Sequence, residues 1–215
     1  MIKLVDKKFK SLLKADYLQD LDLETIVAYN TVYETIAEKG KEYGVDLLVM
    51  GSHGTSGMGD FIGSNTERVI RSSEIPILVV KKPVDLDFRN IVFASNFKEE
   101  AYNGFIKIKE FAKIFDAHLH LLKINTPNYF ETTNNTEDLI DQFVEATDLQ
   151  LEHSINIYND NTIEEGIHNF SDKIEADMIA METHGRTGLK HMLWGSITEN
   201  VANHAKLPVL SIKIQ

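Results

Sequence analysis

The chain contains no cysteine among its 215 residues. This absence excludes disulfide bonds, thiolate catalysis and zinc sites built on cysteine. The sequence also lacks any run of the roughly 20 apolar residues that a membrane-spanning helix needs. Lysines interrupt the N-terminus as far as Lys14, where a signal peptide would be apolar. We therefore expect a cytoplasmic protein without a membrane partner.

Positive charge is in short supply as well. The chain has 22 Lys and Arg against 33 Asp and Glu, which gives a formal net charge of −11 at pH 7. Because nucleic acids are polyanions, this balance disfavours them as partners. The same charge repels ATP at long range, so that any bound nucleotide must be held by local donors. Apolar residues make up 43% of the chain, which is typical of a soluble globular protein.

What the chain does contain is an internal repeat. Residues 45–80 and 176–212 follow the same order, in which a short apolar run leads through a glycine-rich loop into a helix and a second apolar run. Gly54 and Gly185 are 131 positions apart, whereas Gly63 and Gly195 are 132 apart, so the first loop is one residue shorter. Such a period indicates a duplicated structural unit.

Each copy of the repeat predicts a buried parallel strand, a loop, a helix and another strand. Ser64 with Glu67, and Ser196 with Glu199, have the spacing of a capping box, in which the serine and the glutamate satisfy free amides of the first helical turn. We therefore expect each Gly-Ser pair to lie at a helix N-terminus. Free amides and the helix dipole make that position a seat for phosphate.

The motifs Met-Gly-Ser-His-Gly and Gly-Ser-x-Thr-Glu-x-Val resemble those of the universal stress protein family, and the resemblance spans nearly the whole chain in two copies. It implies a Rossmann-like α/β fold, with a doubly wound parallel five-stranded sheet of strand order 3-2-1-4-5, in tandem with an incomplete first copy. Nucleotide-binding members of that family hold ATP at the carboxyl ends of strands 1, 2 and 4, at a topological switch point.

The repeat also predicts how the chain is divided. We expect a shortened first domain in residues 1–82, a linker in residues 83–88 and a complete second domain in residues 89–215. Counting back by the repeat places the opening β-α-β of the first copy before Met1. We expect the remaining strands of that copy to pair with each other or with a second chain, because exposed strand edges associate.

Three elements are predicted ahead of the first repeat unit. The apolar stripe of residues 1–20 predicts an amphipathic helix, and residues 23–29 are predicted to form a strand. Residues 31–43 are predicted to form a helix, which the pair Thr31 and Glu34 would cap.

The family resemblance assigns a nucleotide site to named residues. Asn96 stands where the family has an aspartate that contacts adenosine, and Ile124 stands where an apolar residue touches the adenine. The glycines and serines of the loops would receive the phosphates of ATP, with Mg²⁺ as the companion ion. The candidate residues are Asn96, Ile124, Gly185, Arg186, Gly188, Gly195, Ser196 and Ile197 in the second copy, and Gly51, Gly54, Gly63 and Ser64 in the first.

Neither copy has the complete family pattern. Glu182 replaces the first glycine of the second loop, which adds a carboxylate near the expected triphosphate. The first copy has a shortened loop and lacks the strands that would hold the adenine. An interpretation in which both loops are only glycine-cornered connections, with serines that cap helices, therefore stays open.

By resemblance, the leading prediction is a stress-response sensor or regulator that binds ATP. No Walker A lysine and no nucleophile elbow follow the strands, so no catalytic residue is identified and we do not expect an enzyme. His118 and His120 share one strand face, but no third ligand for a metal is evident.

Two other functions remain open. One is an interaction module without a nucleotide, which acts through pairing of residues 75–80 with 207–212, either in a homodimer or in an intrachain pseudo-dimer. The other is an enzyme of the wider superfamily that activates substrates with ATP.

Overall fold

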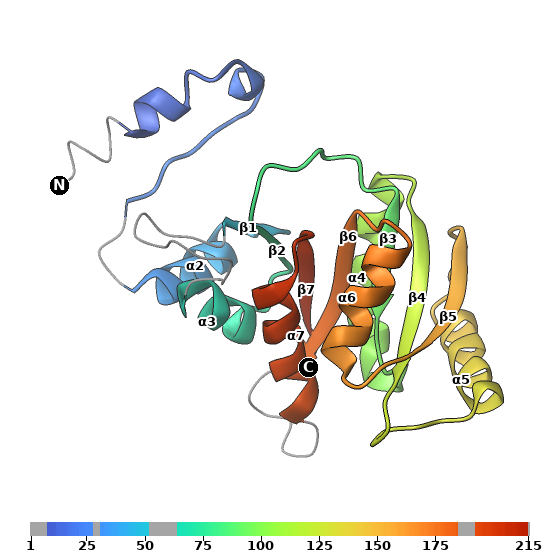
Figure 1. Ribbon diagram of the computed structural model, residues 1–215. Coiled ribbons are helices and arrows are strands. Elements are labelled where there is room, and N and C mark those ends of the chain that lie inside the picture. The colour runs from blue at the N-terminus through green and yellow to red at the C-terminus, as the bar shows by residue number, and fades with distance from the viewer. Residues whose placement is uncertain (1–7, 28–30, 52–63, 185–191, 215) are drawn as a thin grey trace.

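The computed structural model describes residues 8–27, 31–51, 64–184 and 192–214. The part of the chain up to β2 is here called the first lobe, and the part from β3 onward the second lobe. The two lobes share a single seven-stranded sheet (Figure 1). The first lobe contains η1 (Asp16–Leu18), α2 (Val32–Glu42), β1 (Leu48–Gly51), α3 (Ser64–Ser72) and β2 (Ile77–Val80). The second lobe contains β3 (Asn90–Ala94), η2 (Glu99–Ala101), α4 (Tyr102–Ile114), β4 (His118–Asn125), α5 (Thr133–Ala146), β5 (His153–Asn159), α6 (Ile163–Lys173), β6 (Met178–His184), α7 (Met192–His204) and β7 (Val209–Ile214).

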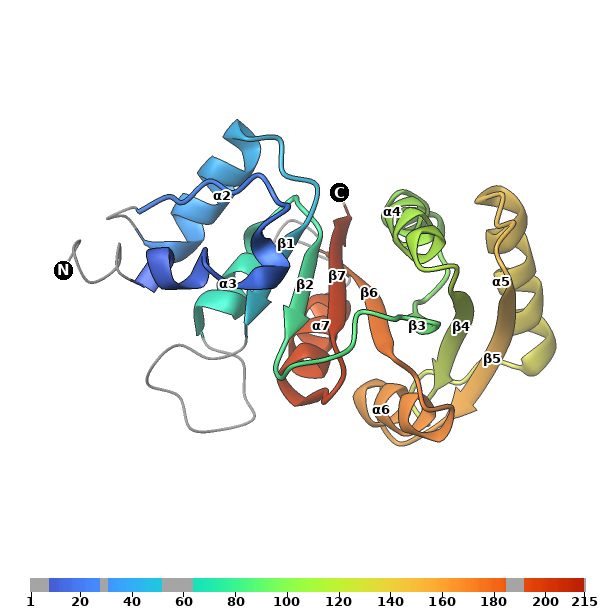
Figure 2. The same ribbon diagram turned by 90° about the horizontal axis from the view of Figure 1, so that it is seen from above.

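The second lobe has the predicted topology. Its five strands lie in the order β5-β4-β3-β6-β7, and every neighbouring pair is parallel. Numbered within the lobe, this order is 3-2-1-4-5, which confirms the doubly wound sheet. Viewed from above in Figure 2, α4 and α5 lie on one face of these strands and α6 and α7 on the other.

The two lobes join through their last strands. β2 pairs with β7 in antiparallel fashion, with Leu78 opposite Leu210 at the centre of the paired residues. Both leucines are buried, at 4% and 1% exposed. Of the two arrangements expected for these edges, the structure therefore shows the one within a single chain. Because the pairing reverses direction, the carboxyl ends of the first-lobe strands point to the opposite edge of the sheet from those of the second lobe.

The helices beside this seam repeat the same relation. The guanidinium of Arg71 on α3 donates two hydrogen bonds to Glu199 on α7, at 2.8 and 2.5 Å. At the equivalent positions the amide of Asn203 donates to Glu67 over 3.1 Å. The repeat offset of 132 relates Glu67 to Glu199 and Arg71 to Asn203, so the two contacts are related by a pseudo-twofold axis. The duplicated lobes thus face each other as two subunits of a dimer would.

The N-terminal predictions are confirmed only in part. The helix in 31–43 is confirmed as α2, with Thr31 at its N-cap position. The predicted cap is wrong, because the Thr31 side chain accepts no bond from the helix amides and its hydroxyl instead donates to the Glu34 carboxylate. The amphipathic helix over residues 1–20 is wrong where the structure describes it, because only residues 8–12 are α-helical before a turn and η1. Residues 1–7 lie outside the described part of the chain.

The strand predicted in residues 23–29 is also wrong over its described part. Residues 23–27 have no regular structure, and all five are exposed. In the predicted order 3-2-1-4-5 this segment would be strand 3 and would pair with strand 2. The described first lobe contains only β1 and β2, which correspond to strands 4 and 5. A strand without a neighbour leaves its amides and carbonyls to water, so the backbone gains nothing from extending there.

Within the described residues no helix is both long and apolar enough to cross a bilayer.

Candidate functional site

The centre of the second lobe has the geometry of a topological switch point. β3 pairs with β4 on one side and with β6 on the other, and Ala94 at the end of β3 lies opposite both Leu122 and Met181. The connections from β3 and β6 leave toward different sides of the sheet. Open α/β sheets bind their ligands beyond the carboxyl ends of the strands at such a point.

Asn96 lies at this edge of the sheet, two residues beyond β3. Its side-chain oxygen accepts a hydrogen bond from the Lys98 amide over 3.0 Å, and the hydroxyl of Ser95 accepts one from the Phe97 amide over 3.0 Å. Phe97 has a positive φ of 58°. These bonds stabilise the turn after β3. Neither of them uses the side-chain nitrogen of Asn96. The side chain is 8% exposed.

Ile124 lies at the end of the neighbouring strand and is 5% exposed. The first turn of α6 packs closely over it, because a Cβ added to Gly166 would lie 2.8 Å from a methyl carbon of Ile124. Thr162 caps that turn, with its hydroxyl accepting from the Glu165 amide at 3.1 Å. The structure therefore brings Asn96 and Ile124 to adjacent strand ends, as the sequence predicts.

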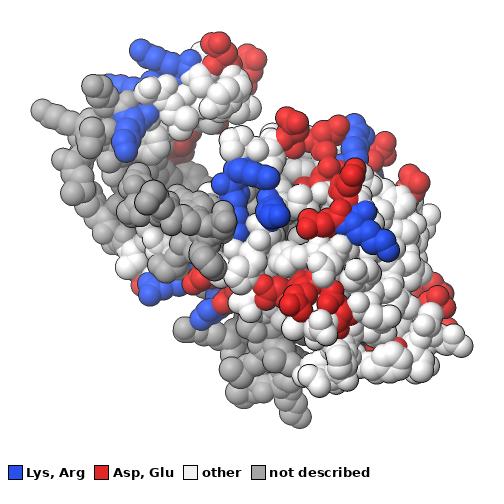
Figure 3. Space-filling view, viewed as in Figure 1, with Lys and Arg blue, Asp and Glu red and all other residues white. Residues whose placement is uncertain are grey.

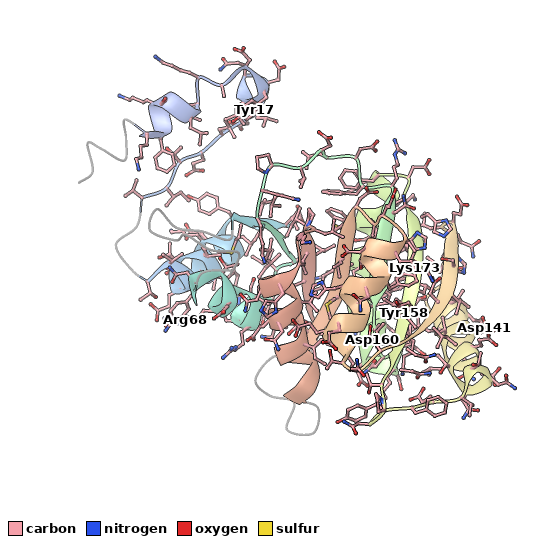
Figure 4. All side chains as sticks on the ribbon, in the orientation of Figure 1. Tyr17, Arg68, Asp141, Tyr158, Asp160 and Lys173 are labelled. Atoms are coloured by element: carbon pink, nitrogen blue, oxygen red, sulfur yellow. The ribbon has the colours of Figure 1, made fainter. Side chains whose placement is uncertain are left out.

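An open cavity of about 450 Å³ extends this edge beyond β4 and β5. Figure 4 labels Asp160, which lies at this end of β5. The lining combines amide, hydroxyl and carboxylate groups with two apolar residues, namely Asn125, Thr126, Pro127, Phe130, Asn159, Asp160 and Asn161. We did not predict this cavity, although the polar runs that directly follow two apolar strands were a signal for it.

Glu182 lies on β6, but its side chain packs beneath α4. Alternation along the strand turns it to the same face as Met178 and Ala180, toward Gly104, where an added Cβ would lie 3.1 Å from its Cγ. Its carboxyl group accepts a hydrogen bond from the Ser95 hydroxyl over 2.9 Å. Burial raises the pKa of Glu182 well above its ordinary value. The expected charge near a triphosphate is therefore reduced, because the buried acid favours its neutral form.

In both repeats the strand before the glycine loop is tied to the helix after the loop by the same bond. The hydroxyl of Thr198 donates to the Glu182 carbonyl over 2.9 Å, and the hydroxyl of Thr66 donates to the Gly51 carbonyl over 3.2 Å. These threonines occupy equivalent positions in the two repeats. We missed this role, although the repeated Thr-Glu pair was the signal for it. The bond fixes the position of each helix relative to the strand that precedes it.

The remaining candidate residues fall in three groups. Ile197 packs against the core beneath α7, and Gly51 is exposed at the end of β1. Ser64 is the first residue of α3, as predicted. Outside the described residues lie Gly54, Gly63, Gly185, Arg186 and Gly188.

The predicted start of the second-lobe helix is wrong. α7 begins at Met192, so Gly195 and Ser196 lie within its first turns rather than at its N-terminus. The carboxylate of Glu199, which the capping box would use, is bound by Arg71 of the other lobe. This contact alone does not explain the shifted start, because Glu67 of the first copy is bound in the same way by Asn203 and α3 nevertheless begins at Ser64.

The two histidines of β4 are engaged with neighbouring polar groups. The ring nitrogens of His120 lie 3.0 Å from the Ser154 hydroxyl and 3.2 Å from the Asn90 side-chain oxygen. Burial, helped by the nearby His118, lowers the pKa of His120 to about 4. In the part of the chain that the structure describes, no cluster of three residues is placed to hold a metal ion.

The model of the universal stress protein family matches residues 3–81 and 87–213. This chain belongs to the universal stress protein family.

Among its curated relatives, universal stress protein Slr1230 of Synechocystis sp. is 22% identical over 170 residues, which cover 78% of this chain and 58% of the relative. Universal stress protein E of Photorhabdus laumondii is 23% identical over 218 residues, covering 90% of this chain and 69% of the relative. The chain thus spans well under two thirds of the Synechocystis protein.

Among solved structures, a universal stress protein from Archaeoglobus fulgidus superposes with a TM-score of 0.74 at 21% identity. The match covers 99% of this chain and 78% of that structure. At this identity the likeness shows the shared fold, a tandem Rossmann-like sheet.

Proposed function

We propose that this universal stress protein binds an adenine nucleotide at the carboxyl edge of its second-lobe sheet and acts as a sensor or regulator. The switch point between β3 and β6 carries the proposal, since it sets Asn96 and Ile124 side by side at adjacent strand ends. Asn96 offers hydrogen bonds for a ribose, and Ile124, although covered by α6, makes the neighbouring strand end apolar, as a base would require. ATP with Mg²⁺ is the ligand that the family resemblance favours.

The electrostatics near this edge support binding of an anion. The net charge of −11 repels a nucleotide at a distance, so that the local environment must compensate. Glu182 opposes binding less than its formal charge suggests, because its carboxyl is buried under α4 and its pKa is raised. The first turns of α7 add oriented backbone amides and the positive end of a helix dipole.

The groups gathered at this edge favour regulation over catalysis. Within the described residues the side chains near the strand ends are mainly amides and hydroxyls, from Asn96, Asn125 and Thr126. These groups bind and orient a ligand, but they are poor general bases at neutral pH. We therefore assign the bound nucleotide the part of a signal rather than a substrate.

Calorimetric titration with ATP and Mg²⁺ tests the proposal. We expect binding near the micromolar range, about −8 kcal/mol. Asn96→Ala should weaken it about tenfold, because the ribose contact is lost. Asn96→Asp retains the oxygen that accepts from the Lys98 amide and should bind at least as tightly as the parent chain. A folded protein that gives no heat at millimolar ATP would refute nucleotide binding.

A matched pair of variants assigns the lobe. Gly195→Val changes the glycine of the second repeat, and Gly63→Val changes its equivalent in the first. We expect only Gly195→Val to abolish binding, because only the second lobe has the neighbouring strands β3 and β4. Loss of binding in Gly63→Val alone would move the site to the first lobe. Titration with GTP under the same conditions shows whether the adenine base is selected.

A further inference from the structure

One face of the first lobe lacks the cover that its counterpart has. Val49 on β1 and Ala180 on β6 are equivalent residues of the repeat, and both point away from the layer of α2, α3, α6 and α7. Ala180 is fully buried beneath α4, whereas Val49 is 65% exposed. Among the described residues, no helix occupies the place over β1 that α4 occupies over β6.

A groove of about 500 Å³ lies next to this face, between α4 and the amino ends of β1 and β2. Its floor and walls are apolar, formed by Val45, Leu47, Ile75, Phe111, Ile114 and Phe115. Ile114 is 76% exposed, so the wall is accessible from solvent. Three carboxylates and one lysine also line the groove, from Asp46, Glu74, Glu110 and Lys107. The groove therefore suits an apolar segment with mainly basic flanks.

The N-terminal segment, residues 8–21, has these properties. It exposes Leu12, Tyr17 and Leu21 at 51%, 76% and 57%. Its three lysines, Lys8, Lys10 and Lys14, outnumber its two aspartates, Asp16 and Asp20, so the segment carries a net positive charge that complements the acidic groove. Figure 3 shows both basic and acidic side chains on this segment at the upper left. Phe9, Leu13, Tyr17 and Leu21 recur every four residues, which is the spacing by which a helix fills an apolar groove.

The segment does not occupy the groove of its own chain. Figures 1 and 4 show it extending away from the sheet, with Tyr17 far from the strands. Its root is fixed on the α2 side, where the Tyr43 hydroxyl donates to the Glu24 carboxylate over 2.9 Å. Only residues 8–12 are α-helical, which fits an amphipathic segment that has no surface to pack on.

We propose that the groove docks the N-terminal segment of a second copy of this chain. Each copy then supplies one segment and receives one, so that the exchange closes as a two-fold dimer. Docking covers the apolar side chains of the segment and the open groove at once, and it pairs lysines of one copy with the acidic residues of the other. Packing on the groove extends the helix beyond residue 12.

Sedimentation velocity of the full chain over a range of concentrations tests the proposal. We expect a monomer–dimer equilibrium whose dissociation constant rises at least about tenfold in Tyr17→Asp and in Ile114→Asp, because each places a charge in the apolar contact. Both residues are 76% exposed, so the fold tolerates the changes, and circular dichroism checks this. Ile106→Asp, on the same helix but outside the groove lining, should leave the constant unchanged.

Mixing the two variants isolates the exchange. The Tyr17→Asp chain keeps its groove and the Ile114→Asp chain keeps its segment, so an equimolar mixture retains one of the two contacts. We expect the mixture to dimerise more tightly than either variant alone. A mixture no tighter than its components, or a parent chain that stays monomeric at all concentrations, overturns the proposal.

Cross-linking distinguishes a second copy from the chain's own segment. Because the chain has no cysteine, Ser11→Cys and Glu110→Cys place unique thiols on the segment and on the groove. A short bismaleimide should join the two variants into a covalent heterodimer when they are mixed. A chain that carries both changes and cross-links only within itself, at low and at high concentration, overturns the proposal in favour of docking in its own groove.

Discussion

Glu182 places a carboxyl group among the buried apolar residues of the second lobe. It occupies a glycine position of the nucleotide motif, yet its side chain is 6% exposed, beneath α4 and against Ser95. The second lobe accommodates it beside Gly104 of α4, where an added Cβ would lie 2.6 Å from Ile214 and 3.1 Å from the Glu182 Cγ. In the first lobe the equivalent residue is Gly51, and a Cβ there would meet only open space. The substitution is therefore a packing feature of the complete lobe.

A pH dependence of stability follows from this burial. Since the pKa of Glu182 is raised in the folded chain, its favourable contribution is fully present below the unfolded value near 4.5 and is lost as the pH rises through the folded value. Glu182→Gln keeps the acceptor for Ser95 but has no proton to lose. We expect the free energy of unfolding of this variant, measured by urea denaturation, to rise relative to that of the parent chain as the pH rises above 4.5, by at most about 1.4 kcal/mol per pH unit.

Comparing Glu182→Gln with the parent chain removes the effect of His120, which is present in both. The lowered pKa of His120 makes the fold more stable, not less stable, as the pH rises. Because His120 is neutral in the fold, its contribution is present above pH 6.5 and declines as the pH falls toward 4 in both chains alike. A constant difference between Glu182→Gln and the parent chain across pH 5 to 9 would contradict a buried, neutral Glu182.

At the scale of elements, the contact between α6 and β4 positions Ile124 of the proposed nucleotide site. Gly166 allows the first turn of α6 to lie on Ile124, because a side chain at this position would meet two Ile124 carbons at 2.8 and 2.9 Å. The close contact holds Ile124 at the strand end. The helix position and the ligand surface are thus set together.

Gly166→Ala should disturb both the packing of α6 and the position of Ile124. We expect it to destabilise the fold by about 1–3 kcal/mol through overpacking, and to weaken ATP binding because Ile124 must shift. Chemical denaturation measures the first effect and calorimetric titration the second. Gly51→Ala, where no heavy atom lies within 4 Å, is the control and should change stability by no more than about 0.5 kcal/mol. An unchanged stability in Gly166→Ala would show that α6 moves freely.

At the scale of the whole molecule, the antiparallel pairing of β2 with β7 makes one structure from two repeats. Two hydrophobic core clusters each combine residues of both lobes. The first cluster contains Leu78 of the first lobe, and the second contains the first-lobe residues Val69, Ile70, Ile77 and Val79. Neither cluster is complete without both lobes. The first lobe therefore depends on the second for its burial, since the structure describes only two strands of its own.

The shared cores predict a single cooperative unfolding transition. We expect one calorimetric peak with equal calorimetric and van't Hoff enthalpies, despite the two repeats. Leu210→Ala, at the centre of the seam, should lower stability by about 2–5 kcal/mol and shift the whole peak. Two separate peaks, with only one moved by Leu210→Ala, would show that the lobes unfold independently.

The sequence by itself determined the parts of this protein that depend on local patterns. The repeat, the glycine loops and the apolar strands gave the α/β class, and the family resemblance gave the strand order of the second lobe. The pattern around Thr31 correctly predicted where α2 begins, although the Thr31 side chain makes no capping bond. Asn96 and Ile124 were correctly placed at adjacent strand ends, because parallel strands bring their carboxyl ends to one edge.

The tertiary structure decided what depends on residues far apart in the chain. Arg71 takes Glu199, which lies 128 positions away, and the predicted capping box with Ser196 loses its carboxylate. The strand expected in residues 23–29 lacks a neighbour in the described chain, and propensity alone does not supply hydrogen-bond partners. The seam within one chain, the burial of Glu182 and the open groove beside α4 likewise follow from which surfaces meet. Local periodicity carries no information about that meeting, since it records only how one element repeats along itself.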